Sequence, residues 1–346
     1  MFTPKYAITN QLLANIKKIY SLVQELNNRR FPKIALAEFE KTARELSTHA
    51  STSIEGNPLP LTEVKKLLKS KPENIRDSER EILNYNQALT ALDQQLKKDH
   101  LDPSLDLILD IHGEVTAGLL PTWESGQLRR KPVVIQDPRS GKIVYIPPNS
   151  NQVDKMIQDL MDFVDQEKTQ IDPLIIAGIF HKQMVLIHPF MDGNGRTTRL
   201  ATKVVLANMG LNTFNLFSFE NYYNQNVTKY FLMVGEYGDY YEIRNQINFT
   251  NWLEYFTAGI IDELLRVSKL LPTIGKTPDS KLEHHHQTIL KYIRQNGFIA
   301  DRDYAKLTPR AKPTRAQDFR KLINLGLIER KGGGRSTYYI LKTPKP

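Results

Sequence analysis

The chain has 346 residues, of which 40% are apolar and none is cysteine. Its length and composition indicate a globular protein of two or more domains, and the lack of cysteine excludes disulfide scaffolds, thiol catalysis and thiolate-bound zinc. The first residues carry no apolar signal core, and no stretch approaches the roughly 20 apolar residues of a membrane span. These features predict a cytoplasmic protein with no membrane partner.

Helix-period patterns dominate the sequence in chain order. One β-hairpin interrupts them at residues 131–148, where two strand-like runs flank the turn DPRSG. The stretch 271–282 is rich in Pro, Gly, Thr and Ser and is predicted to be a linker. The predicted helices are 10–27, 37–54, 62–70, 76–98, 103–119, 151–168, 172–187, 195–209, 219–237 and 248–270.

The net charge of +9 is concentrated at one end of the chain. Residues 281–346 contain 15 lysines and arginines against 5 acidic residues, or +10, and the remainder contains 32 against 33, or −1. A separate basic unit indicates an anionic partner such as DNA, although a well-solvated basic surface would have the same composition.

The stretch HPFMDGNGRTTRL, residues 188–200, lies between two predicted helices. Pro189 disfavours helical geometry in the residue before it, so the upstream helix should end near His188. Gly193 and Gly195 can adopt positive φ and turn backbone N–H groups inward, while the N-terminus of the next helix adds free donors and a positive dipole. The pattern predicts a phosphate site.

Four side chains in this stretch extend the hypothesis. Arg196 and Arg199 stand at i and i+3 on one helix face and could hold two phosphates of a polyphosphate. Asp192 offers an oxygen ligand for Mg²⁺, and His188 has a reference pKa suited to a general base. Each residue alone has a structural explanation as a cap, a turn or a solvated charge. The turn explanation fails because both flanks are helical, and the spacing of a P-loop is absent.

The same stretch matches the motif H-P-F-x-[DE]-G-N-G-R-x-x-R at every specified position, so the chain resembles the Fic family. The resemblance implies a helical catalytic core, residues 81–270, that transfers AMP from ATP to a hydroxyl of a protein side chain. It implies that His188 is the base and Asp192 the Mg²⁺ ligand. It also implies that the α- and β-phosphates lie against Gly193, Asn194 and Gly195, and that the β- and γ-phosphates are held by Arg196 and Arg199.

The stretch STSIEGN, residues 51–57, resembles the inhibitory motif that some Fic proteins carry upstream of the core. The resemblance implies that Glu55 pairs with Arg199 and keeps the γ-phosphate from its productive position, with Ser51 as a supporting hydrogen-bonding group. Without the resemblance, the stretch would be interpreted as an ordinary helix C-terminus. In some family members the corresponding glutamate positions water for the reverse reaction. An N-terminal helical region, residues 1–80, would carry this inhibitor.

Two further stretches resemble accessory parts of the family. The hairpin 131–148, preceded by SGQLRR, resembles the flap, and its edge KIVYIP could take the target peptide as an extra strand opposite His188. The stretch 219–231 resembles the helix that lines the adenine pocket, with Tyr230 as the best candidate. The structural alternatives are a surface hairpin and a core aromatic residue.

Residues 283–346 have the order of a winged helix, three helices and a glycine-tipped hairpin, and resemble the module appended to many bacterial Fic proteins. Thr314 is the predicted N-cap of the third helix. The run 284–286 is interpreted as a surface cluster at a helix start rather than a metal site. Winged helices bind either DNA or protein, and the candidate DNA phosphate contacts are Arg315, Arg320, Lys321 and Arg335.

The predicted fold class is therefore mainly α, with a helical Fic core, a short β-hairpin flap and a small winged-helix α+β domain. The predicted function is an autoinhibited adenylyltransferase that uses ATP and Mg²⁺ and modifies Tyr, Thr or Ser of a target protein or itself; family members often form homodimers. Two alternatives stay open. One is a DNA-binding regulator with the core as nucleotide sensor, and the other is an enzyme that removes AMP using Glu55 or transfers another phosphorylated group. The complete motif favours the first reading, because a pure sensor would not require His188.

Overall fold

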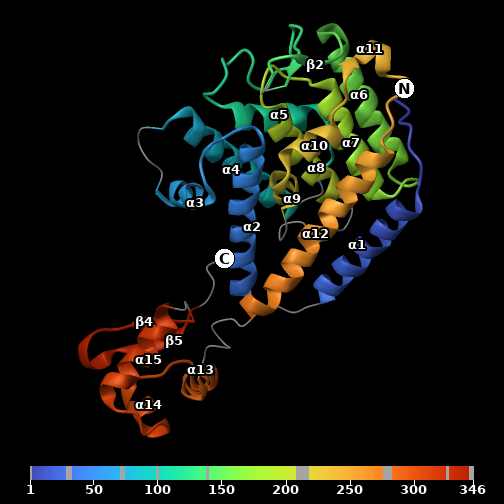
Figure 1. The fold of residues 1–346 in the computed structure, drawn as a ribbon. Coiled ribbons are helices and arrows are strands. Elements are labelled where there is room, and N and C mark those ends of the chain that lie inside the picture. The colour runs from blue at the N-terminus through green and yellow to red at the C-terminus, as the bar shows by residue number, and fades with distance from the viewer. Residues whose placement is uncertain are drawn as a thin grey trace. The chain divides into compact units, whose positions relative to one another are not determined.

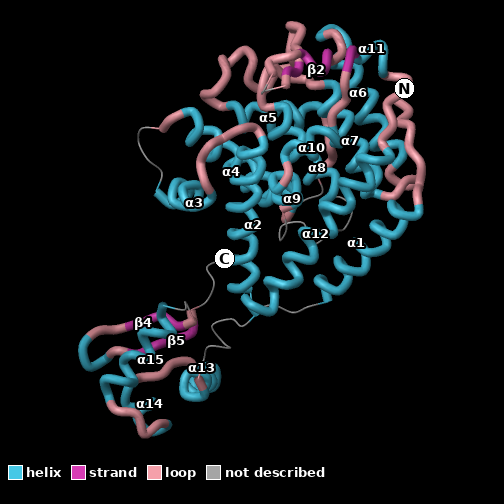
Figure 2. Tube along the Cα trace, in the orientation of Figure 1, coloured by secondary structure: helices cyan, strands magenta, loops and turns pink. Residues whose placement is uncertain are grey.

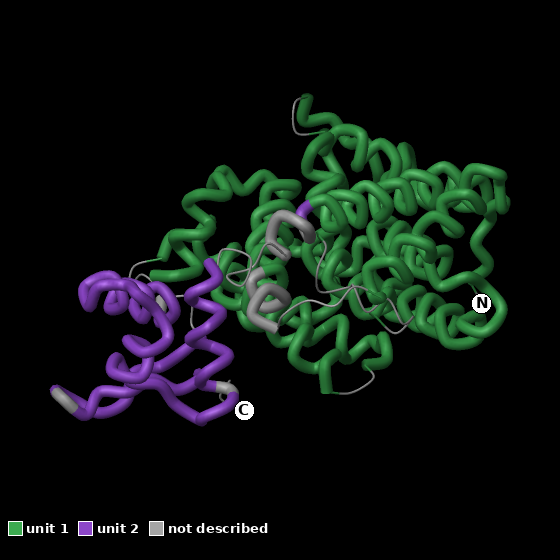
Figure 3. Tube along the Cα trace, turned by 90° about the horizontal axis from the view of Figure 1, so that it is seen from below, with its two compact units in different colours: residues 1–269 green, residues 270–346 purple. Residues whose placement is uncertain are grey.

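The computed structural model describes residues 2–28, 33–70, 75–98, 101–137, 140–207, 218–275, 283–324 and 327–342. The chain divides into two compact units, 1–269 and 270–346, each considered by itself (Figure 3). Helices dominate both units and strands are short (Figure 2), which confirms the predicted mainly α class. Among the helices described, none is both long and apolar enough to span a bilayer.

The first unit combines the predicted N-terminal region and the predicted core in one compact body. Its elements in order are α1 (Asn10–Asn28), α2 (Lys33–Ile54), α3 (Leu61–Ser70), α4 (Asp77–Leu96), α5 (Leu105–Thr116), β1 (Ile135–Gln136), β2 (Ile143–Ile146), α6 (Ser150–Glu167), α7 (Pro173–Ile187), α8 (Asn194–Ala207), α9 (Phe219–Gln225), α10 (Val227–Val234), β3 (Gly238–Asp239), α11 (Tyr240–Ile243) and α12 (Thr250–Gly275), which ends in the second unit.

Two buried helices, α7 and α8, lie at the centre of this unit, with α2, α4, α5 and α6 packed against one or both (Figure 1). The sequence of α7 is apolar on nearly every side, which is typical of a helix enclosed by others. Its start is set by Pro173 at the first position and by Asp172, whose carboxylate accepts from the N–H of Leu174 at 2.9 Å. The residue at which α7 begins is therefore set by the local sequence.

The predicted hairpin forms, but it gains a third strand. β1 pairs antiparallel with β2, and β3 pairs parallel with the other side of β2 through Tyr145 and Ile146. The prediction that the edge KIVYIP is open to a target peptide is therefore wrong for these two residues, because Gly238 and Asp239 already occupy their outer side. The sequence does not indicate this third strand, because β3 is only two residues long and its pairing is set by the tertiary fold.

One predicted helix is broken. The pattern at 219–237 forms α9 and α10, separated by Asn226, whose φ of −147° and ψ of 77° are not helical. The Asn226 side chain accepts from the N–H of Lys229 at 3.0 Å, so it caps the second helix instead of continuing the first. Helix α10 ends before Gly235.

The second unit has its own core and the predicted order of three helices and a hairpin. The core is formed by Ile289, Leu290, Ile293, Ile299, Tyr304, Phe319, Leu322 and Ile328. The elements are α13 (His284–Asn296), α14 (Asp301–Leu307), α15 (Lys312–Asn324), β4 (Ile328–Lys331), η2 (Gly334–Ser336) and β5 (Tyr338–Leu341), with β4 and β5 antiparallel.

Two boundaries near this unit differ from the prediction. Thr314 is not the N-cap of α15, because the helix starts at Lys312 and Pro313 fits its first turn without costing a hydrogen bond. The predicted linker is helical through Gly275, since a single proline removes only one intrahelical bond from a helix that already has buried residues from Trp252 to Val267. The rest of the linker, 276–282, lies outside the described residues.

Candidate active site

His188 sits where α7 ends, in a left-handed conformation with φ 50° and ψ 61°. Its N–H donates to the carbonyl of Met184 at 3.1 Å, and Pro189 prevents a further helical turn. Among the described residues it is the one non-glycine residue with positive φ. Such a conformation costs energy and occurs most often at functional sites, where the surrounding structure enforces it.

The imidazole of His188 is neutral at physiological pH. Burial of the ring lowers its pKa to about 4, against a smaller opposing effect from the carbonyl of Val185 and from the Glu55 carboxylate. One nitrogen of a neutral imidazole keeps a free lone pair, which can accept a proton from a hydroxyl.

The loop that follows His188 is closed by Asn194. The Asn194 amide donates to the carbonyl of Phe190 and its Oδ1 accepts from the N–H of Phe190, both at 2.9 Å. Gly193 has φ 76°, and its N–H donates to the Asp192 carboxylate at 2.6 Å. Since the Asn194 side chain is used to brace the loop, the predicted phosphate contacts of this stretch would come from backbone N–H groups at the start of α8.

Arg199 is fully buried and bound by the predicted inhibitory motif. Its Nη2 donates to the Glu55 carboxylate at 2.6 Å and to the carbonyl of Ser51 at 2.9 Å, while its Nε donates to the Ser51 hydroxyl at 2.7 Å. Burial alone would lower the pKa of Arg199, but Glu55 and nearby tyrosines raise it above its ordinary value. The structure thus brings together Ser51, Glu55 and Arg199, which the sequence separates by more than 140 positions.

Gly195 lies directly against this ion pair. A β-carbon at this position would overlap the Glu55 carboxylate. The glycine therefore lets an anion approach the backbone at the start of α8, and in this structure the anion is the carboxylate of Glu55.

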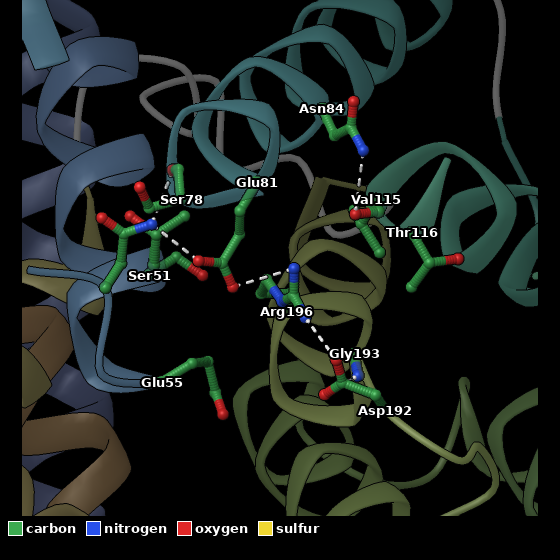
Figure 4. A network of polar contacts seen from close by, with 12 residues as sticks. Ser51, Glu55, Ser78, Glu81, Asn84, Val115, Thr116, Asp192, Gly193 and Arg196 are labelled. Carbon is green, nitrogen blue, oxygen red and sulfur yellow. Dashed lines mark hydrogen bonds and ion pairs between the residues drawn. The ribbon is translucent and has the colours of Figure 1, made fainter. Parts of the chain in front are cut away.

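Arg196 is held by a second glutamate that the sequence did not indicate (Figure 4). Its Nη1 lies 2.9 Å from Glu81 of α4, and its Nη2 lies 3.2 Å from Asp192. Glu81 also accepts from the amide of Asn57 at 2.7 Å, so the residue that ends the inhibitory stretch is linked to Arg196 as well. Each motif arginine is thus paired with a carboxylate from outside the 188–200 stretch.

Asp192 is placed where a Mg²⁺ ion could be bound. Its side chain is 64% exposed although its neighbour Arg196 is buried, so oxygen lone pairs of the carboxylate face solvent. An exposed carboxylate before the start of α8 can supply an oxygen ligand to Mg²⁺. Nη1 of Arg199 lies next to Gly195 and is a buried donor with no hydrogen-bond partner among the described residues, which suits a phosphate oxygen.

Comparison with known proteins shows which family this part of the chain is similar to. Residues 101–206 match the Fic/DOC family. The chain contains a Fic domain. Two curated relatives, the proteins named protein adenylyltransferase fic-1 of Caenorhabditis elegans and Caenorhabditis briggsae, are 30% identical over 201 residues and 32% identical over 215 residues. The matches cover 56% and 59% of this chain, which spans only 38% and 40% of the length of those relatives.

Solved structures with the same fold include Fic proteins. A Fic family protein from Desulfovibrio desulfuricans superimposes with a TM-score of 0.66 and 21% identity over 100% of both chains. Fic-1 from C. elegans superimposes with a TM-score of 0.60 and 24% identity over 76% of this chain and 73% of that chain. The helical Fic fold expected from the motif is therefore confirmed.

His112 of α5 supports the Fic loop and was not indicated by the sequence. Its ring stacks on Phe190, with centroids 3.7 Å apart and planes 4° apart. Its Nδ1 accepts from the N–H of Gly126 at 2.9 Å, so Nε2 carries the proton and donates to the carbonyl of Asp192 at 3.0 Å. Burial lowers the pKa of His112 to about 4, which keeps the ring neutral in this role.

Arg129, in the stretch SGQLRR, joins the flap to the Fic loop. Its buried guanidinium donates to the carbonyls of His188 at 2.7 Å, Lys131 at 3.2 Å, Ile187 at 3.3 Å and Pro148. Two of these carbonyls belong to the ends of the predicted flap and two to the end of α7. The sequence shows only a pair of arginines here, and it does not indicate that Arg129 is buried while Arg130 is exposed.

Replacing Arg129 with methionine should lower the free energy of unfolding of the first unit by about 3 kcal/mol, because buried carbonyls lose their donor. The measurement is urea denaturation followed by tryptophan fluorescence, since both tryptophans lie in this unit. The exposed Arg130 provides the matched control, and Arg130→Met should change the unfolding midpoint little. Equal midpoints for the two variants would contradict the anchoring role.

Tyr230, the predicted adenine contact, is part of the aromatic core. The residue is 1% exposed, its ring stacks on Tyr223 with centroids 4.8 Å apart, and its hydroxyl lies 3.0 Å from Nε2 of His181. Its assignment to an adenine pocket stays a prediction. The observed contacts are those of the structural alternative, a core aromatic residue at helical spacing.

A buried polar network behind Arg199 was also not indicated by the sequence. Glu220 is fully buried, and its carboxylate lies 3.1 Å from Nζ of Lys203 and accepts from the hydroxyls of Ser47 and Tyr85. These residues come from α9, α8, α2 and α4. The network therefore ties α2, which carries the predicted inhibitory motif, to α8, which carries the two motif arginines.

The predicted DNA or protein contact through 283–346 stays a prediction, with one correction. Arg315 is not available to a phosphate, because its Nε and Nη2 donate to the two oxygens of Asp301 at 2.8 and 2.9 Å. Arg320 is exposed and Lys321 lies 3.6 Å from Glu283. The side chain of Arg335 lies outside the described residues.

Proposed function

We propose that the chain is a protein adenylyltransferase that transfers AMP from ATP to a Tyr, Thr or Ser hydroxyl of a target protein or of itself, and that Glu55 restrains it. One observation carries the proposal: the Glu55 carboxylate holds Arg199 at 2.6 Å directly beside Gly195, within the predicted phosphate site. A carboxylate held against a helix N-terminus and an arginine occupies the place that suits a phosphate.

In the proposed reaction, a bond forms between the hydroxyl oxygen and the α-phosphorus while the bond to the leaving pyrophosphate breaks. Neutral His188 accepts the hydroxyl proton. Backbone N–H groups of Asn194 and Gly195, at the start of α8, and the guanidinium of Arg196 stabilise the phosphate charge. Asp192 would hold Mg²⁺, which neutralises charge on the departing phosphates when bound. The chain's own contribution is mainly positioning and charge stabilisation.

Competition for Arg199 explains the proposed restraint. Nη2 and Nε of Arg199 are engaged by the inhibitory motif, so a γ-phosphate must displace Glu55 or bind elsewhere. ATP that binds with Glu55 in place would hold its α-phosphorus away from the attacking hydroxyl. The same carboxylate, close to the site, is also the group that the AMP-removal alternative requires.

The transfer rate should be nearly independent of pH between 6 and 8. Because the pKa of His188 is about 4, the ring is about 1% protonated at pH 6 and is already the base form. The rate should fall only as pH drops through the lowered pKa, since protonation removes the acceptor. Initial rates of the Glu55→Gly variant in buffers of constant ionic strength test this. A rate that rises tenfold through pH 6.5 would contradict it.

The direct test of the function is intact-protein mass spectrometry after incubation with ATP and Mg²⁺. The Glu55→Gly variant should gain the mass of AMP on itself or on a protein in a cell extract, and ATP labelled at the α-phosphate should transfer its label. ATP labelled only at the γ-phosphate is the control, because phosphoryl transfer would instead move that label. Retention of both labels in free nucleotide would overturn the proposed transfer.

A further inference from the structure

A second cluster of titratable groups lies at the start of α13, in the C-terminal unit. Among the described residues, Glu283, His285 and His286 offer ligand atoms that all lie within 4.8 Å of one another. Asp318 of α15 lies beside both imidazoles. The interpretation of residues 284–286 as a surface cluster is wrong for His286, whose side chain is 2% exposed; His285 is partly buried, at 15%, and His284 is exposed.

The spacing of the donors fits a tetrahedral ion. Oδ1 of Asp318 lies 3.3 Å from Nε2 of His285 and 3.5 Å from Nε2 of His286, and the two rings have centroids 4.1 Å apart. Ligands that bind Zn²⁺ at about 2.1 Å are separated by about 3.4 Å in a tetrahedron. Both measured separations, from Oδ1 of Asp318 to each Nε2, match this tetrahedral spacing.

His286 supplies an independent observation. Both of its ring nitrogens are buried, and neither has a hydrogen-bond partner among the described residues. Nε2 of His285 is likewise buried without such a partner. Buried polar groups are almost always satisfied, so buried nitrogens that meet no hydrogen-bond criterion and share one carboxylate neighbour are suited to bind a cation.

The surrounding residues would hold the ligands in place. Oδ2 of Asp318 accepts from the buried hydroxyl of Tyr304 at 2.8 Å. Glu283 lies 3.6 Å from Nδ1 of His285, the nitrogen opposite the shared oxygen. Outer carboxylates and hydroxyls in these positions fix the ring orientation and rotamer of metal ligands.

We propose that His285, His286 and Asp318 form a Zn²⁺ site that joins α13 to α15, with Glu283 orienting His285. Imidazole and carboxylate ligands suit zinc, and three protein ligands leave the fourth position to water. The site needs no cysteine and belongs to a unit separate from the Fic domain.

Arg310 competes with the ion. Its Nε lies 3.0 Å from Oδ2 of Asp318, its Nη2 donates to Oδ1 of Asp318 at 3.3 Å, and its Nη1 lies 3.3 Å from Nδ1 of His285. Since the Arg310 side chain is 32% exposed, a bound cation can displace the guanidinium toward solvent while Tyr304 keeps Asp318 in place. Arg310→Gln should therefore strengthen zinc binding, because it removes a positive charge from beside the ion.

The test is calorimetric titration of the full chain with Zn²⁺ at pH 7.5, after purification without a tag and treatment with EDTA. One equivalent should bind, and His285→Gln, His286→Gln or Asp318→Asn should weaken binding at least tenfold. Glu283→Gln should weaken it by about 10-fold, the effect of losing an orienting partner. His284→Gln is the matched control, because His284 belongs to the same run but is exposed, and it should bind like wild type. Asp192→Asn should also retain the site, which separates it from the predicted Mg²⁺ position.

The visible spectrum of the Co²⁺-loaded wild type provides a readout that needs no variant. Absorption typical of tetrahedral cobalt with nitrogen and oxygen ligands is expected, and Zn²⁺ should abolish it. Circular dichroism identifies variants that fail to fold; if Asp318→Asn is one, His285→Gln and the cobalt spectrum decide. No uptake by the wild type, or an equal loss in His284→Gln and His285→Gln, would overturn the site.

Discussion

Glu55→Gly should raise the rate of AMP transfer about 10- to 100-fold. The estimate follows from the contact that the substitution removes, a hydrogen bond between two charged groups, worth about 1.5–3 kcal/mol. Removal of the carboxylate frees Nη2 of Arg199 for the γ-phosphate and opens the space beside Gly195. Initial rates of label transfer from ATP labelled at the α-phosphate measure the effect.

Two further variants separate charge from backbone effects. Glu55→Gln keeps the length of the side chain and removes its charge, so it should activate as well, though less than glycine, because the amide still fills the space. Glu63→Gln is the control, since Glu63 is an exposed carboxylate on the adjacent α3. If Glu55→Gly and wild type transfer AMP at the same rate, the inhibitory role is wrong, although the transfer function would stand.

His188→Asn should reduce AMP transfer at least 100-fold with ATP binding nearly unchanged. General-base catalysis contributes about 10²- to 10⁴-fold, and no other described residue takes the place of this imidazole at the end of α7. The comparison is best made in the Glu55→Gly background, where wild-type His188 gives a measurable rate. Calorimetric titration with ATP and Mg²⁺ reports binding separately.

Asparagine is the better replacement because of the backbone at this position. With φ 50°, an alanine would be strained, whereas asparagine tolerates the left-handed region. His188→Ala and His188→Asn should therefore lose the same activity, but only alanine should lower the unfolding temperature. If His188→Asn also lost ATP binding, the residue would matter for the shape of the loop rather than as a base.

The sequence was sufficient to predict helices and loops whose boundaries are set by neighbouring residues. The helices α7 and α8 have apolar patterns that define them, and the glycines and Pro189 define the loop between them. The motif positions of that loop could be assigned residue by residue from the resemblance. The pairing of Glu55 with Arg199 could also be predicted from the resemblance. No periodicity in the sequence indicates it, because 144 positions separate the two residues.

The supporting residues could not be predicted, because their roles depend on tertiary contacts. Glu81, His112 and Arg129 are ordinary residues in their own segments, and only packing brings them to Arg196, Asp192 and His188. The break at Asn226 had a local cause, an amide that caps better than it continues a helix. The helical pattern on both sides of it concealed that cause.

The anchor formed by Arg129 has a consequence for how substrates are distinguished. One rigid guanidinium binds the carbonyls at both ends of the flap region and the carbonyl of His188 itself. A peptide that distorts the flap as it docks would therefore shift the imidazole with it. We expect poorly matched targets to be rejected through slower turnover more than through weaker binding, so that fidelity appears in kcat while KM stays similar.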